Sequence, residues 1–305
     1  MEVITDIKSN QSIVQRSIDK HGHAAEHNLA NYLHLIGENE KHVFLRFEDD
    51  MGIMASVDNN NNWSVLSEVL APEERKMDII MRFLDYSLTQ NGGKKVVFEL
   101  LSDTRKELLK NLREEKKFRA CKLNYSLYWP IFSLKDWDEE MNGKAWKKLR
   151  NVKNKFLKSY NVKIRNINDY PSDILNRLVD RWIENRKNDD GVDEQEYYRI
   201  IKSKFEGYDS VRIVDIEGKP CAMTAGWKIP NTNMYYSSIG VYDPRYEGVG
   251  VFANIDDLNF LKQQGFEYAD FGGSDKSLLN FKKKFKPETI YSTHIFSVVL
   301  DEKEL

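Results

Sequence analysis

The sequence lacks any long hydrophobic run and any cluster of cysteines. No stretch of 18 apolar residues occurs in the 305-residue chain, which excludes a transmembrane helix. Cys121 and Cys221 are far apart in apolar, strand-like contexts, so a cysteine zinc site and a thioredoxin-like motif are excluded. We expect two reduced, packed thiols, with one disulfide as the alternative. The N-terminal segment is polar and carries acidic residues, so we expect a cytoplasmic protein without a signal peptide.

An excess of charge of one sign is also missing. The formal net charge is −2 although 31% of the residues are charged, so composition gives no overall bias toward nucleic acid or membranes. With 41% hydrophobic residues, the chain can form one large globular domain or two of ordinary size. His23 and His27 have the i, i+4 spacing of a metal-ligand pair, but no second half of a site accompanies them. We therefore expect no metal.

The order of the predicted elements repeats between two halves of the chain. In the first half we expect strand or coil through residue 22, a helix at 24–36, strands at 43–47, 52–57 and 63–69, a helix from Pro72, a strand at 95–101, a helix at 103–118 and a strand at 120–128 closed by Trp129-Pro130. In the second half we expect helices at 172–187 and 194–205, strands at 211–216, 219–228 and 234–242, a helix at 251–264, a strand at 266–271, a helix at 275–285 and a strand at 289–299. The repeat predicts an α/β (α+β) protein of two tandem units, residues 1–135 and 136–305, each a mostly antiparallel twisted sheet flanked by helices.

A glycine-containing turn after residue 242 carries the main functional signal. The segment 243–250 (DPRYEGVG) ends the preceding strand at Pro244 and opens the next helix. The first N–H groups of a helix have no backbone partner and the helix dipole adds positive charge there, so such a turn can bind phosphate. Arg245 adds a guanidinium group that can grip phosphate. The alternative is a turn that only links strand and helix.

This turn resembles the [Q/R]-x-x-G-x-[G/A] pattern of GNAT-type acyltransferases, in which the loop after the fourth strand binds the pyrophosphate of acyl-CoA. The matching residues are Arg245-Tyr246-Glu247-Gly248-Val249-Gly250. The family also has a bulge in the preceding strand, here at 237–239, beside which the acyl chain lies. The resemblance thus implies a set of donor-binding residues: Ile239, Val241, Arg245, Gly248, Val249, Gly250, Val251 and Phe281. Phe281 stands where the family often carries its general-acid tyrosine, so the usual acid is absent. The corresponding turn of the first half, 70–75, has no glycine, and that half is expected to be degenerate.

A second resemblance lies further along the chain. The stretch 270–273 (DFGG) followed by 278–285 (LLNFKKKF) is similar to the D-F-G-G and L-x-x-F-K-x-x-F stretch of aminoacyl-tRNA-dependent FemAB-like transferases, and it resembles the soluble domain of lysyl-phosphatidylglycerol synthases. These families share the GNAT-like fold, so the two resemblances agree on the fold and differ in the donor. Residues 144–165 carry nine Lys or Arg and no acidic residue. They predict a helix with a basic face, which is either a solvated connection or a wall for the phosphates of a coenzyme or an RNA.

Acyl transfer requires a bound donor, a neutral attacking amine and a stabilised oxyanion. Residues close to the expected cleft give the catalytic candidates Tyr236, Ser238, Asp270 and Lys282. For Asp270 the alternative is a structural cap on the glycine turn, and for Lys282 a basic helix end. The acids at 193, 194 and 196 are expected as a helix cap and first-turn acids, with recognition of a cationic acceptor as the alternative.

The leading hypothesis is an N-acyltransferase that moves an acyl group from acyl-CoA, such as acetyl-CoA, to a small-molecule or peptide amine. One alternative is an aminoacyl-tRNA-dependent transferase of the FemAB type, with tRNA as a partner. The basic segment 144–165 and Lys282 favour that alternative. A third hypothesis is a non-catalytic GNAT-like module that binds a ligand.

Overall fold

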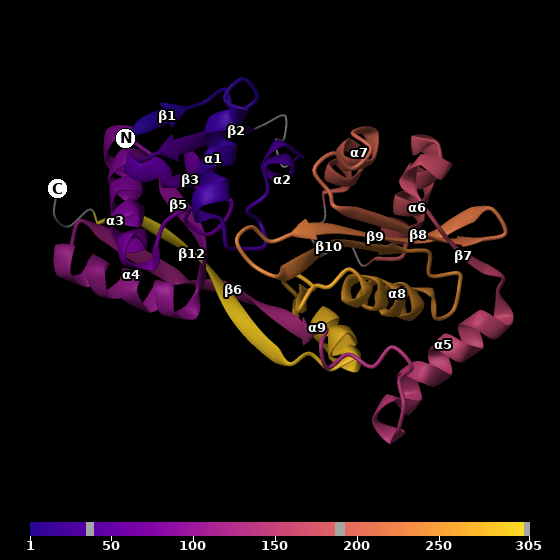
Figure 1. Ribbon diagram of the computed structural model, residues 1–305. Helices are drawn as coiled ribbons and strands as arrows, with labels where there is room; N and C mark the ends of the chain where they lie inside the picture. Colours follow the sequence, from indigo (N-terminus) through magenta and orange to yellow (C-terminus); the bar gives the residue numbers. More distant parts are fainter. Residues whose placement is uncertain (35–39, 187–192, 302–305) are drawn as a thin grey trace.

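The computed structural model describes residues 1–34, 40–186 and 193–301 (Figure 1). The strands of the first half are β1 (Glu2–Ile4), β2 (Glu40–Arg46), β3 (Gly52–Asp58), β4 (Asn62–Val65), β5 (Lys95–Leu101) and β6 (Phe118–Ser133). Its helices are α1 (Gln11–His21), α2 (Leu29–His34), α3 (Glu73–Leu84) and α4 (Ser102–Glu115), with a 3-10 turn η1 (Glu48–Asp50) and a π-helical turn η2 (Asp85–Gln90).

The second half repeats this order of elements. Its strands are β7 (Val162–Arg165), β8 (Ser210–Ile216), β9 (Lys219–Lys228), β10 (Met234–Tyr242), β11 (Tyr268–Asp270) and β12 (Thr289–Leu300). Its helices are α5 (Lys147–Ser159), α6 (Ser172–Glu184), α7 (Glu194–Lys202), α8 (Val249–Gln263) and α9 (Lys276–Lys282), with 3-10 turns η3 (Lys144–Trp146), η4 (Ile167–Asp169) and η5 (Lys283–Phe285). No helix within the described ranges combines the length and the apolar character needed to cross a membrane.

All the strands of the described residues join one sheet, in the order β1-β2-β3-β4-β5-β12-β6-β11-β10-β9-β8-β7. The pairs β4–β5 and β10–β11 are parallel, and the other neighbouring pairs are antiparallel. A mixed, mostly antiparallel sheet flanked by helices is therefore confirmed. The parallel pair of the first half, β4–β5, corresponds in element order to the parallel pair of the second half, β10–β11.

The two halves exchange strands at the centre of the sheet. The last strand, β12, lies between β5 and β6, and it pairs with β6 from Thr289 to Leu300. In return, the end of β6 pairs with β11, with Ile131 opposite Asp270. Each side of the sheet therefore depends on a strand from the other half of the chain. The division of the chain at residue 135 stays a prediction.

Two expectations for the N-terminal region are wrong. The segment before residue 22 contains strand β1 and helix α1, which buries Val14 and Ile18 in a cluster with Phe44 and Leu70. This helix is mostly polar, so it depends on that packing more than on its own pattern. The helix expected at 24–36 begins only at Leu29. Residues 35 and 36 lie outside the described residues.

The expectation that a strand ends at Trp129-Pro130 is also wrong, because β6 continues to Ser133. Pro130 has no N–H group, and a proline is tolerated where a strand has no partner on that side. On the β11 side the pairing of β6 starts only at Ile131. The carbonyl of Pro130 accepts a hydrogen bond of 3.3 Å from the N–H of Phe271. Other boundaries differ by a few residues, as at β4, which ends at Val65.

Helices cover both faces of the second half of the sheet. Helices α6 and α7 pack on one face through a cluster that includes Leu178, Ile201, Ile239 and Val241, and α8 and α9 lie on the other face (Figure 1). Helix α5 has the predicted apolar stripe and basic face, and it packs on the same side as α8 by burying Leu149 and Phe156.

We predict that truncating a core side chain of β12 destabilises the whole chain and not only its second half. Phe296 is fully buried and stacks on Phe98 of β5, with ring centroids 6.2 Å apart. Phe296→Ala should lower the free energy of unfolding by about 3–5 kcal/mol. Urea unfolding followed by tryptophan fluorescence and by circular dichroism measures this, and the two signals should change together.

Ile290→Ala on the same strand is the matched control, because Ile290 is exposed. It should cost less than about 1 kcal/mol. Two separate unfolding transitions, of which Phe296→Ala moves only one, would contradict the dependence of both halves on β12.

Candidate functional site

The parallel strands β10 and β11 separate soon after they begin. Their pairing is limited to Met234–Tyr236 opposite Tyr268–Asp270. Immediately beyond, the register of β10 against β9 shifts between Ser237 and Ile239, which is a β-bulge. The bulge and the separation occur where the GNAT resemblance places them. They open the sheet beside the turn 243–250 without breaking the pairing of β10 with β9.

The glycine turn opens α8, as the sequence predicts. Gly248 has φ +89° and precedes the first helical residue, and such a left-handed backbone favours glycine. A Cβ on Gly250 would lie 3.2 Å from the ring of Tyr242, and one on Gly248 would lie 3.2 Å from Cγ1 of Val152 on α5. Helix α5 therefore covers one side of the turn, where Lys155 also pairs with Glu247 at 2.8 Å.

Arg245 is engaged by an acidic partner. Its Nη2 lies 2.6 Å from Oδ2 of the buried Asp243, and Nε of Arg181 lies 2.7 Å from the same oxygen. Burial alone would raise the pKa of Asp243, but hydrogen bonds from Arg245 and Arg181 bring that pKa below its ordinary value. A donor phosphate at Arg245 would share the guanidinium group with this carboxylate. The phosphate-binding role of Arg245 and of Gly248–Val251 stays a prediction.

The other predicted donor-binding residues are mostly packed in cores. The side chains of Ile239 and Val241 are buried under α6 and α7. Val251 and Phe281 are partly buried against the cluster between α8 and α9, and the ring of Phe281 contacts Phe285. A donor could meet Ile239 and Val241 only through their backbone. Their roles also stay predictions.

Asp270 holds the glycine turn at the end of β11. Its Oδ1 accepts a hydrogen bond of 2.8 Å from the N–H of Gly272, and its Oδ2 accepts one of 2.9 Å from the Tyr291 hydroxyl. Burial raises the pKa of Asp270 to about 6, and these two hydrogen bonds oppose that rise. The carboxyl group thus has a structural role in the turn and a proton affinity suited to acid–base chemistry near neutral pH.

Two further candidates meet Asp270 at this turn. Lys282 donates from its buried Nζ to the carbonyls of Phe271 and, at 3.2 Å, Gly272. Burial lowers the pKa of Lys282 to about 8, and the nearby Asp270 opposes this shift. A Cβ on Gly272 would lie 3.4 Å from the hydroxyl of Tyr236, so that phenol reaches the turn as well. Burial raises the pKa of Tyr236.

Ser238 occupies the bulge of β10 and forms a hydrogen bond with Tyr208. Burial raises the pKa of the Tyr208 phenol, and the hydrogen bond with Ser238 opposes that rise. Tyr236, Asp270 and Lys282 therefore meet at the Gly272 turn, whereas the contact of Ser238 is with Tyr208. Tyr291 joins them through its hydrogen bond to Asp270. No sequence motif marks Tyr291, because its contact with Asp270 spans two strands.

A cavity of about 600 Å³ opens at the centre of the sheet and reaches Asp270. Its walls come from the five neighbouring strands β5, β12, β6, β11 and β10 and from the segments 23–26 and 65–68. Five carboxyl groups line it, from Glu26, Glu68, Glu99, Asp270 and Glu288. Aromatic rings form part of the wall, and those of Trp129 and Tyr291 are stacked with centroids 5.7 Å apart.

Burial makes the carboxyl groups of Glu26, Glu68 and Glu99 hard to ionise. It raises the pKa of Glu26 to about 8 and raises the pKa values of Glu68 and Glu99. Within the described residues, Oε1 of Glu68 is buried without a hydrogen-bond partner, and Nζ of Lys76 lies 3.8 Å from it. Glu99 accepts a hydrogen bond of 2.5 Å from Thr293. A cationic ligand in the cavity would favour the ionised carboxylates and relieve their desolvation.

No sequence pattern predicts a site at Glu26, Glu68 and Glu99. They are distant in the sequence, and no common motif contains them. One signal was available for Glu99, which is an acidic residue inside the otherwise apolar strand segment 95–101. An acid at such a position needs a partner or a polar cavity.

The structure also bears on the helix cap at Asp193, the two cysteines and the His23–His27 pair. Asp193 accepts a hydrogen bond from the N–H of Gln195 and caps α7, which confirms the cap interpretation. Cys121 and Cys221 are free thiols, as expected. His27 accepts hydrogen bonds at Nδ1 from the N–H groups of His23 and Ala24, so its spacing from His23 serves a turn. Among the described residues, no three His, Cys, Asp or Glu side chains form a group that could hold a metal ion.

Comparisons with known proteins agree with this geometry. The family model described as "Phosphatidylglycerol lysyltransferase, C-terminal" matches residues 21–294. The structure of L-PGS from Bacillus licheniformis is 17% identical with a TM-score of 0.66, covering 96% of this chain and 91% of that chain. FemX is 10% identical with a TM-score of 0.62, covering 96% of this chain and 97% of that one. A tandem GNAT protein from the clavulanic acid biosynthesis pathway is 10% identical with a TM-score of 0.56, covering 98% of both chains.

Among curated proteins no match is found. At these identities the similarity to solved structures concerns the fold. It confirms the GNAT-like fold and the resemblance to the FemAB-like and lysyl-phosphatidylglycerol synthase families.

We predict that Asp270→Asn removes part of the pH dependence of stability. The pKa of Asp270 is about 6 in the folded chain and 3.8 in the reference state. Between these values the folded state binds the extra proton, so the contribution of Asp270 to stability falls as the pH rises from about 4 to 6, by up to about 1.4 kcal/mol per pH unit. Urea unfolding at half-unit pH steps measures the difference between wild type and variant.

The stability of Asp270→Asn relative to wild type should increase across that interval and then stay constant above pH 7. Glu74→Gln, which changes an exposed acid on α3, is the control and should leave the profile unchanged. Parallel profiles of the wild type and Asp270→Asn would show that the pKa of Asp270 is not raised.

Proposed function

The chain belongs to the family of phosphatidylglycerol lysyltransferase C-terminal domains, and we propose that it transfers an aminoacyl group from an aminoacyl-tRNA to an acceptor. An acyltransferase-type enzyme with a GNAT-like fold follows from the family for either donor. The observation that supports an aminoacyl donor is the central cavity with its five carboxyl groups. The proposal of a charged-tRNA donor includes the cytoplasmic location that the sequence leads us to expect.

The cavity has the chemistry to hold a cationic aminoacyl side chain such as lysyl. Apolar and aromatic surface, including Trp129 and Leu101, can contact the methylene groups of such a chain. Glu68 and Glu99 can receive an ammonium group at its end. An acetyl group would bring no positive charge to these buried acids, so their desolvation would stay uncompensated by the ligand. The description of the matching family also names a lysyl group.

The residues at the Gly272 turn, which follows β11, fit the steps of acyl transfer. The acceptor nucleophile attacks the ester carbonyl, an oxyanion forms, and the ribose oxygen of the donor leaves with a proton. Asp270 is ionised at neutral pH and can take the proton of the nucleophile, while Tyr291 holds its second oxygen. Lys282 and the Tyr236 hydroxyl are the available donors for the oxyanion and the leaving oxygen. The family description names phosphatidylglycerol, whose nucleophile would be a hydroxyl group. The sequence-based hypothesis instead has an amine as the acceptor.

Acyl-CoA is the second candidate donor. The glycine turn at the start of α8 and the bulge of β10 favour it. Against it, α5 covers one side of the turn, where Val152 lies close to Gly248. Calorimetric titration with CoA and acetyl-CoA tests this candidate: micromolar binding that Arg245→Ala weakens would establish it in place of the aminoacyl donor.

We predict that the protein binds lysinamide more tightly than norleucinamide, which has nearly the same shape but lacks the ε-ammonium group. The preference should be at least about tenfold, since an ammonium paired with a buried carboxylate contributes about 1.5–3 kcal/mol. Because burial raises the pKa values of Glu26, Glu68 and Glu99, that of Glu26 to about 8, affinity for lysinamide should rise as the pH increases from 6 to 8, by up to about tenfold per unit. Isothermal titration calorimetry measures both effects.

Glu99→Gln should remove most of the preference and leave norleucinamide binding unchanged. Glu74→Gln, on the exposed surface of α3, is the matched control. Equal affinity for the two amides in the wild type, at every pH in this range, would contradict a cation-binding role for the cavity and the lysyl donor proposed from it.

A further inference from the structure

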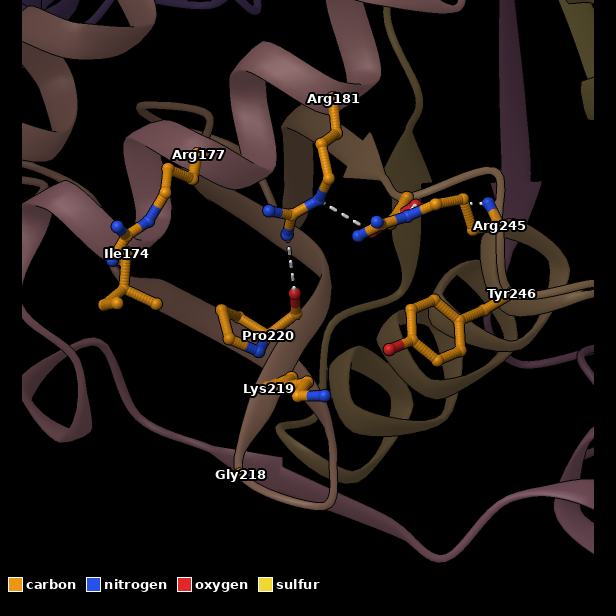
Figure 2. Close-up of a pocket in the computed structure, with 9 residues that line it drawn as sticks. Ile174, Arg177, Arg181, Gly218, Lys219, Pro220, Arg245 and Tyr246 are labelled. Carbon is orange, nitrogen blue, oxygen red and sulfur yellow. Dashed lines mark hydrogen bonds and ion pairs between the residues drawn. The ribbon is translucent and has the colours of Figure 1, made fainter.

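A second cavity, of about 200 Å³, lies at the far end of β10 from the central cavity. It is bounded by α6, by the β8–β9 hairpin and by the turn that leads into α8. Figure 2 shows the side chains of Arg177 and Arg181 from α6, Lys219 from the hairpin, and Arg245 and Tyr246 from the turn around this space. The two cavities share no lining residue.

The buried Asp243 fixes the arrangement of two of these cations. It accepts hydrogen bonds from Nε of Arg181 at 2.7 Å and from Nη2 of Arg245 at 2.6 Å. Nη2 of Arg181 also donates to the carbonyl of Pro220 at 3.5 Å (Figure 2). The guanidinium groups are therefore held before any ligand arrives, which reduces the conformational entropy lost on binding.

The lining is strongly positive although the whole chain is slightly negative. Four cationic side chains face one carboxylate, that of Asp243, so positive charge remains in excess. Arg177 has an outside partner, Asp173 at 3.0 Å, but both of these side chains are more than half exposed, and such a pair is weak in water. Arginine and lysine arranged in this way match the oxygens of a phosphate group.

We infer that this cavity binds a backbone phosphate of the tRNA donor. The inference rests on the proposed function and adds a location to it. Met234 lines the central cavity and Asp243 lines this one, nine residues further along β10 and its end. At about 3.3 Å per residue the two are separated by about 30 Å. A stacked nucleic-acid strand advances about 3.4 Å per nucleotide, so the phosphate would lie about nine nucleotides from the aminoacyl end.

Binding of a fluorescein-labelled tRNA-Lys transcript tests this inference. Fluorescence anisotropy is recorded at several salt concentrations for the wild type and for the double variant Lys219→Glu/Arg177→Glu. Both side chains are exposed, and we expect the thermal unfolding midpoint to stay the same. The expected result is a loss of tRNA affinity of at least about tenfold and a slope of log K against log salt that is smaller by about one for each lost phosphate contact.

Two other charge reversals serve as comparisons. Lys110→Glu, on an exposed part of α4, should leave affinity unchanged. Lys148→Glu reverses an exposed charge on α5, and a loss of binding there but not in the double variant would overturn the inference in favour of α5.

The outcomes separate this inference from the proposed function. If the wild type binds the transcript and the double variant binds it equally well, the phosphate site is wrong and the aminoacyl-tRNA donor stands. If the wild type does not bind the transcript at all, both are wrong. Binding of CoA that the double variant weakens, without any binding of the transcript, would assign the cavity to a coenzyme phosphate and would also overturn the inference.

Discussion

The insertion of β12 between β5 and β6 is the constraint on which the rest of the structure depends. It joins the two repeated units into one sheet, and it places five strands from different parts of the chain side by side. The central cavity is built on those five strands, with Glu99 from β5, Tyr291 from β12, Trp129 from β6 and Asp270 from β11. Without the exchange, neither half of the chain could bring these side chains together. The same pairing that completes the fold therefore also creates the candidate site.

The buried carboxyl groups of the central cavity lower the stability of the folded state, and this loss of stability points to a function for them. Burial raises the pKa values of Glu26, Glu68, Glu99 and Asp270, so their ionisation opposes folding near neutral pH. Apolar residues at these positions would give a more stable sheet. Several acids kept in one cavity at such a cost are typical of a functional site, where the ligand supplies the missing counter-charge.

Local signals predicted much of the fold and part of the site. The turn at 243–250 and the basic helix α5 follow from short patterns whose physics is contained in a few neighbouring residues, and the bulge of β10 was expected from the resemblance to the GNAT family. The position of β12 could not be predicted in this way, because strand order depends on pairing between distant segments. For the same reason Asp270 was found from the motif at 270–273, whereas its partner Tyr291 was not. Helix α1 was not found because its few apolar residues gain their stability only from tertiary packing.

The net charge of −2 hides a separation of charges within the molecule. Carboxyl groups gather in the central cavity, whereas Arg177, Arg181, Lys219 and Arg245 surround the second cavity at the end of β10. A lysylated RNA has the complementary distribution, with a cation at its aminoacyl end and a polyanion behind it. Each region alone would fit many ligands, since acidic pockets and basic patches are common. Together, at a separation of about 30 Å along β10, they favour a long ligand that carries both charges over a compact one. This is the physical reason for preferring an aminoacyl-tRNA to acetyl-CoA, whose acyl group carries no positive charge.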